Sequence, residues 1–401
     1  MTLPDAPWRH RPGLDKLLLV LGAEADETRF VGGAVRDGLL DMPVSDIDIA
    51  TIHPPQDVMQ RLAQAGIKAI PTGLAHGTIT AVLAGKPIEI TTLRCDTSTD
   101  GRRAIIAYTD DWRADAARRD FTINALYAHP LDSQISDYFG GLDDLRTRNV
   151  RFIGDPATRI AEDHLRILRY FRFFARFGKD DPDAQAYAAC VAHANSLMAL
   201  SRERIADELL KLLALPDPVR ALVLMVEGAI LVPVVPEITS AGVGRFAALL
   251  PRELAAPVKP DPLLRLCALL PPDAALADSI AARLKLSNKA RKRISAALNP
   301  LPAYRSIYEL AFRVGAETAR DRIMLDSSVD ATAICELRDW QPPHLSVGGA
   351  VMMALGISKG PDIARALNEV REQWISEAFP GPERTHEIAA QIASKFQRFS
   401  Q

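Results

Sequence analysis

The stretch Phe30-Val-Gly-Gly-Ala-Val-Arg-Asp37, followed by Ser45-Asp-Ile-Asp-Ile-Ala-Thr51, decides the fold of this 401-residue chain. It predicts a strand that turns at Gly32 and Gly33 into a helix, and then a second strand. Two glycines at such a turn let the backbone come close to a phosphate, with N–H groups pointing at it. A tight strand-to-helix turn without any ligand would explain the same pair, so the turn alone leaves both interpretations open.

Two aspartates in the second strand favour a metal site. Alternate residues of a strand share a face, so Asp46 and Asp48 are expected to project together. The isoleucines on either side of Asp48 should then face the core. Paired carboxylates repel each other unless a cation lies between them, and Mg²⁺ prefers carboxylate oxygens together with substrate phosphates. A solvated strand edge is the alternative that needs no metal.

Glu89 offers a third carboxylate. It alternates with isoleucines in Ile88-Glu-Ile-Thr-Thr92, a pattern typical of a strand. If this strand lies beside the strand of Asp46 and Asp48, Glu89 joins them. Such carboxylates hold two metal ions about 3.5–4 Å apart in enzymes that transfer nucleotidyl groups. An exposed strand residue without a ligand is the alternative.

The segment Arg118-Arg-Asp-Phe-Thr-Ile-Asn124 brings two guanidinium groups, a carboxylate and an amide close together in sequence. Guanidinium groups suit the oxygens of a triphosphate. If the segment is helical, Asp120 and Asn124 share one face and are placed to hold ribose hydroxyls. A surface helix with salt bridges is the alternative.

The segment Glu162-Asp-His-Leu-Arg166 lies in the stretch 161–177, which helical spacing of apolar residues predicts to be one helix. On that helix Asp163 and Arg166 share a face, and Arg169 continues it. An aspartate accepts from an exocyclic amine and an arginine donates to ring acceptors, so the pair can read the Watson–Crick edge of a base. An ion pair within the helix is the alternative.

The chain beyond residue 158 is expected to be helical. Ser201 is the predicted N-cap of a helix that reaches Leu213. Residues 216–300 hold many Ala, Leu and Pro and predict short helices, and residues 303–400 are again helical in pattern. The layout is a mixed head followed by a long all-α remainder.

The balance of 48 Lys and Arg against 50 Asp and Glu excludes a protein that is basic all over, as a histone is. It does not exclude local basic patches that bind nucleic acid. From Leu145 to Asp180 there are nine basic and four acidic residues. A second patch, which we call the body patch, consists of Arg283, Lys285, Lys289, Arg291, Lys292 and Arg293. Contact with an RNA backbone and a solvated helix face are the two interpretations of this patch.

Cysteine spacing and the first residues predict a cytoplasmic protein. The four cysteines are too far apart for a zinc knuckle or a redox motif, which predicts reduced thiols in a reducing compartment. The first 25 residues contain three acidic residues and no apolar core, so no signal peptide is expected. The most apolar stretch is too short and interrupted to span a membrane.

Taken together and in this order, these motifs resemble those of class II CCA-adding tRNA nucleotidyltransferases and bacterial poly(A) polymerases, within the polymerase β-like superfamily. The resemblance covers about residues 28–213. Further segments that carry it are Gly73, His76-Gly-Thr-Ile-Thr80, Glu89-Ile-Thr-Thr-Leu-Arg94, Gly140-Gly-Leu-Asp-Asp-Leu145 and Ser201-Arg-Glu-Arg-Ile-Ala-Asp-Glu-Leu209.

The resemblance implies an α+β fold in four parts. A polymerase β-like nucleotidyltransferase head, a mixed sheet with helices, would occupy residues 1–145. A helical neck for base recognition would follow over 146–215, a helical RNA-binding body over 216–300 and a helical tRNA-binding tail over 301–401.

It also implies roles for the residues singled out above. Asp46 and Asp48 would bind catalytic Mg²⁺, with Glu89 as a third catalytic residue. Residues 94–112 would form the flexible loop involved in switching to ATP. The residues that would bind the nucleotide are Gly32, Gly33, Arg36, Arg118, Asp120, Asn124, Asp163, Arg166 and Arg169.

The implied activity is template-independent addition of CCA to the 3′ end of tRNA from CTP and ATP, with release of pyrophosphate. The implied partners are tRNA, CTP and ATP, with no membrane and no protein partner. Poly(A) polymerase and partial CC- or A-adding enzymes stay open as alternatives. The segment 71–78 resembles the CCA-adding form, and residues 380–401 lack a strongly basic tail. The alternative from another functional class is a catalytically silent RNA-binding protein. The presence of Asp46, Asp48, Asp120, Asp163 and Arg166 together argues against it.

Overall fold

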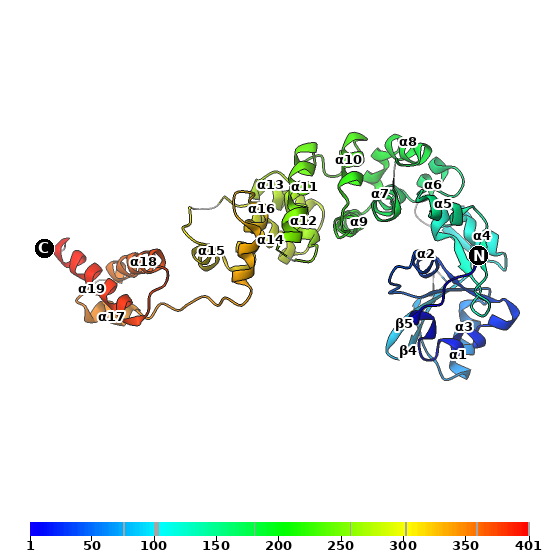
Figure 1. The fold of residues 1–401 in the computed structure, drawn as a ribbon, viewed down its shortest axis with the longest axis horizontal. Helices are drawn as coiled ribbons and strands as arrows, with labels where there is room; N and C mark the ends of the chain where they lie inside the picture. Colours follow the sequence, from blue (N-terminus) through cyan, green and yellow to red (C-terminus); the bar gives the residue numbers. More distant parts are fainter. Residues whose placement is uncertain are drawn as a thin grey trace. The chain divides into compact units, whose positions relative to one another are not determined.

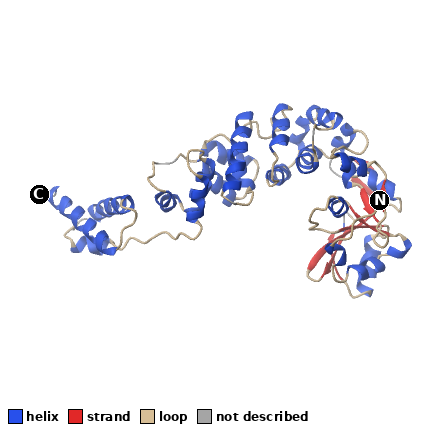
Figure 2. Ribbon diagram, viewed as in Figure 1, coloured by secondary structure: helices blue, strands red, loops and turns tan. Residues whose placement is uncertain are grey.

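The computed structural model describes residues 1–74, 77–99, 104–179, 181–256, 258–300, 303–357 and 360–399. These form two compact units, Met1–Pro236 and Glu237–Gln401. Every strand that the structure describes belongs to the first unit, whereas the second is built of helices (Figures 1 and 2).

The head of the first unit contains a seven-stranded mixed sheet in the order β3-β4-β5-β2-β1-β8-β9. Strands β2 and β5 run parallel, and the other neighbours run antiparallel. The mixed sheet predicted for the head is therefore confirmed. Its strands are β1 (Thr28–Val31), β2 (Asp48–Thr51), β3 (Lys68–Gly73), β4 (Thr78–Leu83), β5 (Lys86–Thr92), β8 (Leu126–Ala128) and β9 (Ile135–Asp137).

A separate two-stranded sheet accounts for part of the predicted flexible loop. Strands β6 (Arg94–Thr99) and β7 (Ala104–Tyr108) pair antiparallel, with Arg94 opposite Tyr108. Residues 100–103, at the middle of the predicted loop, lie outside the described residues, as does His76 of the family motif.

Helices flank the sheet of the head. Alternation along the strands buries Phe30, Ile49 and Ile90 in the core. The helices of the head are α1 (Leu14–Val20), α2 (Gly33–Leu39), α3 (Pro55–Gln64), α4 (Trp112–Ala117) and α5 (Gly141–Thr147).

The first unit continues in helices with an aromatic core. The rings of Phe121, Phe152 and Tyr170 pack together with centroids 5.0–6.2 Å apart, which joins the head to helix α7. Ser201 caps helix α9 as predicted, because its side chain accepts from the N–H of Arg204. The helices here are α6 (Pro156–Glu162), α7 (Arg166–Phe177), α8 (Ala184–Ala192), α9 (Arg202–Leu213) and α10 (Val219–Glu227).

The prediction of a single helix over residues 161–177 is wrong. Helix α6 ends at Glu162, and Asp163 adopts an extended conformation with φ −152° and ψ 107°. The side chain of Asp163 accepts from the N–H of Leu165 over 3.1 Å, and α7 begins at Arg166. Aspartate competes with helical hydrogen bonds through its own carboxylate, which explains the break.

The second unit contains two helical groups. Buried Met352, Val370 and Ile388 form one core between the last three helices. In the described part of the chain, no helix combines the length and apolar character needed to cross a membrane. The helices are α11 (Ser240–Ala255), α12 (Pro262–Leu269), α13 (Ala274–Arg283), α14 (Asn288–Leu298), α15 (Ile307–Val314), α16 (Ala316–Leu325), α17 (Gly349–Ala354), α18 (Gly360–Ser376) and α19 (Pro382–Phe399).

Candidate active site

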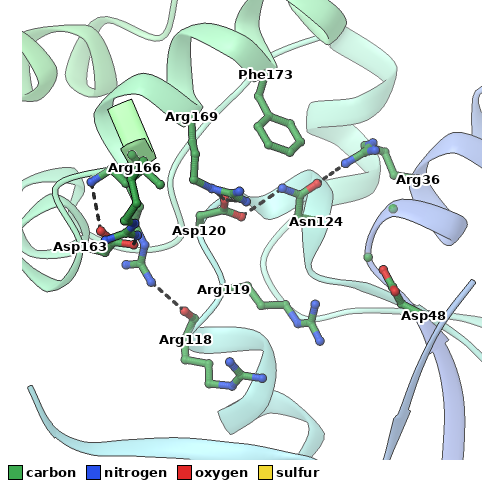
Figure 3. Close-up of a pocket in the computed structure, with 14 residues that line it drawn as sticks. Arg36, Asp48, Arg118, Arg119, Asp120, Asn124, Asp163, Arg166, Arg169 and Phe173 are labelled. Atoms are coloured by element: carbon green, nitrogen blue, oxygen red, sulfur yellow. Dashed lines mark hydrogen bonds and ion pairs between the residues drawn. The ribbon is translucent and has the colours of Figure 1, made fainter. Parts of the chain in front are cut away.

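A pocket of about 510 Å³ lies between the head and the helices that follow it in the first unit (Figure 3). This volume is in the range of small-ligand sites. The pocket brings together Asp48 and all the residues predicted to bind the nucleotide, whereas Asp46 and Glu89 lie outside its lining. The lining consists of Gly32, Gly33, Arg36, Asp48, Arg118, Arg119, Asp120, Asn124, Asp163, Leu165, Arg166, Arg169, Phe173 and Arg204.

The glycine turn forms one wall of this pocket. Gly32 lies between β1 and α2 with φ 66° and ψ −123°, a conformation that residues with a side chain rarely adopt. The predicted order of strand, turn and helix is confirmed, with helix α2 beginning at Gly33, one residue before the predicted start at Ala34. The backbone conformation of the turn therefore requires glycine at position 32 even without a ligand. Gly32 and Gly33 also line the pocket in which a ligand would lie.

Asp48 and Glu89 are neighbours across the parallel pair of strands β2 and β5, in direct register. The condition on which Glu89 was to join Asp48, that the two strands be neighbours, is therefore met. Burial, reinforced by the charges of Glu89 and Asp46, raises the pKa of Asp48 to about 6. The positive charges of Arg119 and Arg36 act in the opposite direction.

Asp46 is placed differently from the prediction. Strand β2 begins only at Asp48, so Asp46 is an exposed residue before the strand, where Ser45 Oγ donates to it over 2.8 Å. Ile47 and Ile49 are buried as expected. Within the described ranges, no three His, Cys, Asp or Glu side chains gather closely enough to hold a metal ion.

The two arginines of the Arg118-Arg119 segment are fixed by Asp115, which is almost fully buried. Arg118 Nε donates to Asp115 Oδ1 over 2.8 Å, and Arg119 Nη2 donates to Oδ2 over 3.1 Å. The hydroxyl of Tyr127 donates to the same carboxylate over 2.6 Å. Burial alone would raise the pKa of Asp115, but its two arginine partners hold it at about 2.

A chain of hydrogen bonds crosses the pocket from Arg36 to Arg169 (Figure 3). Arg36 donates to the carbonyl oxygen of Asn124, whose amide donates to Asp120 over 3.0 Å. Arg169 Nε donates to the other oxygen of Asp120 over 2.8 Å. The charge of Arg169 outweighs burial and lowers the pKa of Asp120. The condition that the segment be an α-helix is not met, and a loop with a 3₁₀ turn at Thr122–Asn124 brings Asp120 and Asn124 together instead.

Asp163 and Arg166 both face the pocket, but they do not form the ion pair offered as an alternative. Asp163 accepts from Arg204 Nη2 over 2.8 Å. Arg166 pairs with Glu162 and donates to the backbone oxygen of Arg118 over 3.1 Å. Each residue is thus held by a partner of its own, at the start of α7 instead of on one continuous helix face.

The lining carries six arginines against three aspartates, so the pocket favours an anion. Sequence reasoning did not single out Leu165, Phe173 and Arg204, whereas Arg119 is one of the two guanidinium groups that it matched to a triphosphate. Phe173 lies under the guanidinium groups of Arg36 and Arg169, 5.3 and 5.4 Å from its ring centre. Phe173 follows Arg169 by four residues on the same helix, so helical spacing could have placed it on the pocket-facing side.

The arginines and lysines of the body patch differ in their burial and contacts. Arg283 pairs with Glu237, Arg291 pairs with Asp278 over 2.8 Å, and Arg293 bridges Asp261 and Asp321. The three lysines of the patch are exposed. The arginines therefore hold the helices of the second unit together, which the one-dimensional pattern did not indicate.

Comparison with known proteins identifies the relatives of this chain. Residues 28–151 match the family described as the poly(A) polymerase head domain, and residues 181–241 match a probable RNA- and SrmB-binding site of polymerase A. The mitochondrial CCA tRNA nucleotidyltransferase 1 of Mus musculus is 35% identical over 378 residues, which cover 90% of this chain and 86% of the relative. A CCA-adding enzyme of Anoxybacillus flavithermus is 38% identical over half of each chain.

Solved structures agree with these relatives. The CCA-adding enzyme of Bacillus stearothermophilus in complex with CTP is 27% identical and covers 97% of this chain and 99% of its own, with a TM-score of 0.76. A Thermotoga maritima CCA-adding enzyme complexed with tRNA, 20% identical with a TM-score of 0.68, shares the fold. With a relative this similar over most of its length, and with the family's motifs gathered at one pocket, the chain belongs to the nucleotidyltransferase family of CCA-adding enzymes and poly(A) polymerases.

Proposed function

We propose that this enzyme adds cytidine, cytidine and adenosine to the 3′ end of tRNA from CTP and ATP, releasing pyrophosphate at each step. One observation carries the proposal: a single pocket contains Asp48 of the sheet, the base-reading residues Asp163 and Arg166, and arginines between them. The relatives named as CCA-adding enzymes, and the one solved with CTP, support it.

The residues around the pocket divide into three tasks. The arginines Arg36, Arg118 and Arg119 suit the triphosphate, because guanidinium groups bind phosphate oxygens at two points. Asp120 and Asn124 are placed for the ribose. Asp163 and Arg166 present an acceptor and donors to the base. This division uses protein groups to position the nucleotide and to stabilise charge, which are the main contributions a protein makes to such transfers.

A divalent metal fits the carboxylates at the head end of the pocket. Asp48 lies beside Glu89 and near Asp46, and their mutual repulsion helps to raise the pKa of Asp48, a cost that a cation would relieve. Mg²⁺ binds through one or two carboxylates together with substrate phosphates, and Asp46 and Asp48 match that pattern. When bound there, the metal would make the RNA 3′-hydroxyl more acidic and neutralise charge on the leaving pyrophosphate.

We also propose the four-part division of the chain, with residues 1–145 as catalytic head, 146–215 as neck, 216–300 as body and 301–401 as tail. The RNA-binding family match at 181–241 and the exposed lysines of the body patch support RNA contact beyond the head. Residues 94–112 would act in the switch to ATP. The four free cysteines support the cytoplasm as the location.

The test is nucleotide addition to tRNA that lacks its 3′ end, resolved on a sequencing gel. We expect two additions with CTP and Mg²⁺, and a third when ATP is also present. Long A-tails would show a poly(A) polymerase. A stop after two cytidines, or addition of adenosine alone, would show a partial enzyme. Binding of tRNA without any addition would show a silent RNA-binding protein.

A further inference from the structure

We infer that Arg204 is a positioning residue that sets nucleotide specificity by fixing the carboxylate of Asp163. The inference rests on the proposed function, because it concerns how the same pocket reads a base. Arg204 lies on helix α9, and Asp163 lies in the break between α6 and α7. The two residues are 41 positions apart in the sequence, and they meet at the pocket lining.

Both oxygens of Asp163 are anchored. Arg204 Nη2 donates to Oδ2 over 2.8 Å, and the backbone N–H of Leu165 donates to Oδ1 over 3.1 Å. The two donors come from different elements, so together they fix the plane of the carboxylate. A carboxylate has about four acceptor positions, and these two contacts leave acceptor positions for a ligand.

The conformation of Asp163 makes this anchoring necessary. The residue is extended and outside any helix, and its side chain is about one-third exposed. A side chain in such a place keeps several rotamers unless a partner selects one. Without Arg204, the contact with Leu165 would be the remaining hydrogen bond to the Asp163 carboxylate among the described residues, and the second oxygen could move away from the base.

The orientation of Asp163 matters because the correct and incorrect bases differ at one exocyclic position that a carboxylate can read, in addition to the adjacent ring nitrogen. Cytosine and adenine carry an amine that donates, whereas uracil and guanine carry a carbonyl that accepts. A carboxylate paired with a guanidinium accepts hydrogen bonds and donates none. A fixed carboxylate therefore attracts the amine and repels the carbonyl, and polar contacts of this kind discriminate more sharply than apolar ones.

The contact is not needed to hold helix α9 in place. The buried Glu208 on the same helix pairs with Arg172 of α7 over 2.6 Å, and Leu209 and Leu212 are buried in the core. Arg204 is half-exposed, and exposed ion pairs contribute little to stability. The role of the Arg204–Asp163 contact is therefore at the pocket.

The experiment uses the full chain with Arg204→Ala, Arg204→Lys and a matched control, Lys211→Ala. Lys211 is an exposed cation on the same helix that pairs with Asp207 over 2.6 Å, and it does not line the pocket. KM and kcat are measured for single additions of CTP, ATP and UTP, and melting temperatures are compared. Arg204→Ala should raise KM for CTP and ATP about tenfold and reduce the preference for CTP over UTP about tenfold, roughly the effect of one polar contact. Arg204→Lys should recover part of the preference, and Lys211→Ala should match the wild type.

An unchanged CTP-to-UTP preference in Arg204→Ala would overturn the inference. So would an equal loss for all three nucleotides accompanied by a lower melting temperature, because that pattern shows a structural role. Absence of any CTP or ATP addition by the wild-type protein would contradict the proposed function itself, and this result is distinguishable because it involves no variant.

Discussion

Asp48 and Glu89 face each other in register on two parallel strands, β2 and β5, at the edge of the candidate active site. This pairing places Glu89, which lies outside the pocket lining, next to Asp48 at the end of the pocket opposite Asp163 and Arg166 (Figure 3). Burial and the neighbouring negative charges both disfavour ionised Asp48. Keeping Asp48 ionised therefore lowers the stability of the head, and the same negative charge attracts a cation.

The first prediction concerns this cost. The pKa of Asp48 in the folded protein, about 6, lies above its ordinary value of 3.8. The stability that the protonated form contributes is therefore complete below pH 3.8 and is lost as the pH rises through 6. At pH 7.5 and without divalent metal, Asp48→Asn should stabilise the protein by about 1–3 kcal/mol.

Thermal melting between pH 4 and pH 7.5 checks this prediction. The difference in melting temperature between Asp48→Asn and the wild type should become smaller towards pH 4. Added Mg²⁺ should also reduce this difference, because it stabilises the wild type. Asp46→Asn is the control, because Asp46 is exposed and should change stability less. A lower melting temperature of Asp48→Asn at pH 7.5 without metal would contradict the account.

The second prediction concerns Asp115, whose buried carboxylate holds Arg118 and Arg119. Asp115→Asn leaves two guanidinium groups without their counter-charge, which should destabilise the protein by about 3–5 kcal/mol. KM for CTP should rise, because both arginines line the pocket. Urea unfolding measures the loss of stability, and steady-state kinetics measure the rise in KM for CTP. Tyr127→Phe removes two hydrogen bonds, one donated to Asp115 and one accepted from Arg119 Nε, but no charge, and should cost about 1–2 kcal/mol. Equal losses in the two variants would show that the charge is unimportant.

The third prediction concerns base reading by Arg166. Arg166→Ala should impair the choice of CTP and ATP over other nucleotides by about tenfold or more, because a donor pair to the base edge is lost. The affinity for tRNA should stay unchanged. Single-nucleotide kinetics and filter binding separate these effects, and an unchanged nucleotide choice would refute the role.

The fourth prediction separates the two kinds of residue in the body patch. Lys289→Ala combined with Lys292→Ala should weaken tRNA binding. The slope of the logarithm of the binding constant against the logarithm of salt concentration should fall by the amount expected for about one to two lost phosphate contacts. The melting temperature should not change, since both lysines are exposed. Arg293→Ala should instead lower the melting temperature, because Arg293 bridges Asp261 and Asp321. Full tRNA affinity at low salt in the double lysine variant would exclude the patch as an RNA contact.

The sequence predicts those parts of the fold that depend on local pattern. Alternating apolar residues around Glu89 indicate strand β5 close to its observed bounds, and Ser201 marks the start of α9. The family motifs indicate nearly all of the pocket residues. These features depend on periodicity and capping, which the chain carries in a few neighbouring residues.

The rest depends on contacts between residues far apart in sequence. The break at Asp163 is invisible to helical spacing, because the apolar period continues through it. The ion pairs of Arg204 with Asp163 and of Arg293 with Asp261 join residues from separate elements. The sequence around one partner therefore does not reveal the other. The division of the chain into two compact units after Pro236 likewise reflects packing between residues far apart in sequence.

The central claim is that Asp48 and the base-reading residues form one active site for CCA addition. It is tested most directly by incubating wild type and Asp48→Ala with tRNA lacking its 3′ end, CTP, ATP and Mg²⁺, and by measuring tRNA binding in parallel. The account predicts addition of C, C and A by the wild type, and no addition but retained tRNA binding by Asp48→Ala. Normal CCA addition by Asp48→Ala would contradict it.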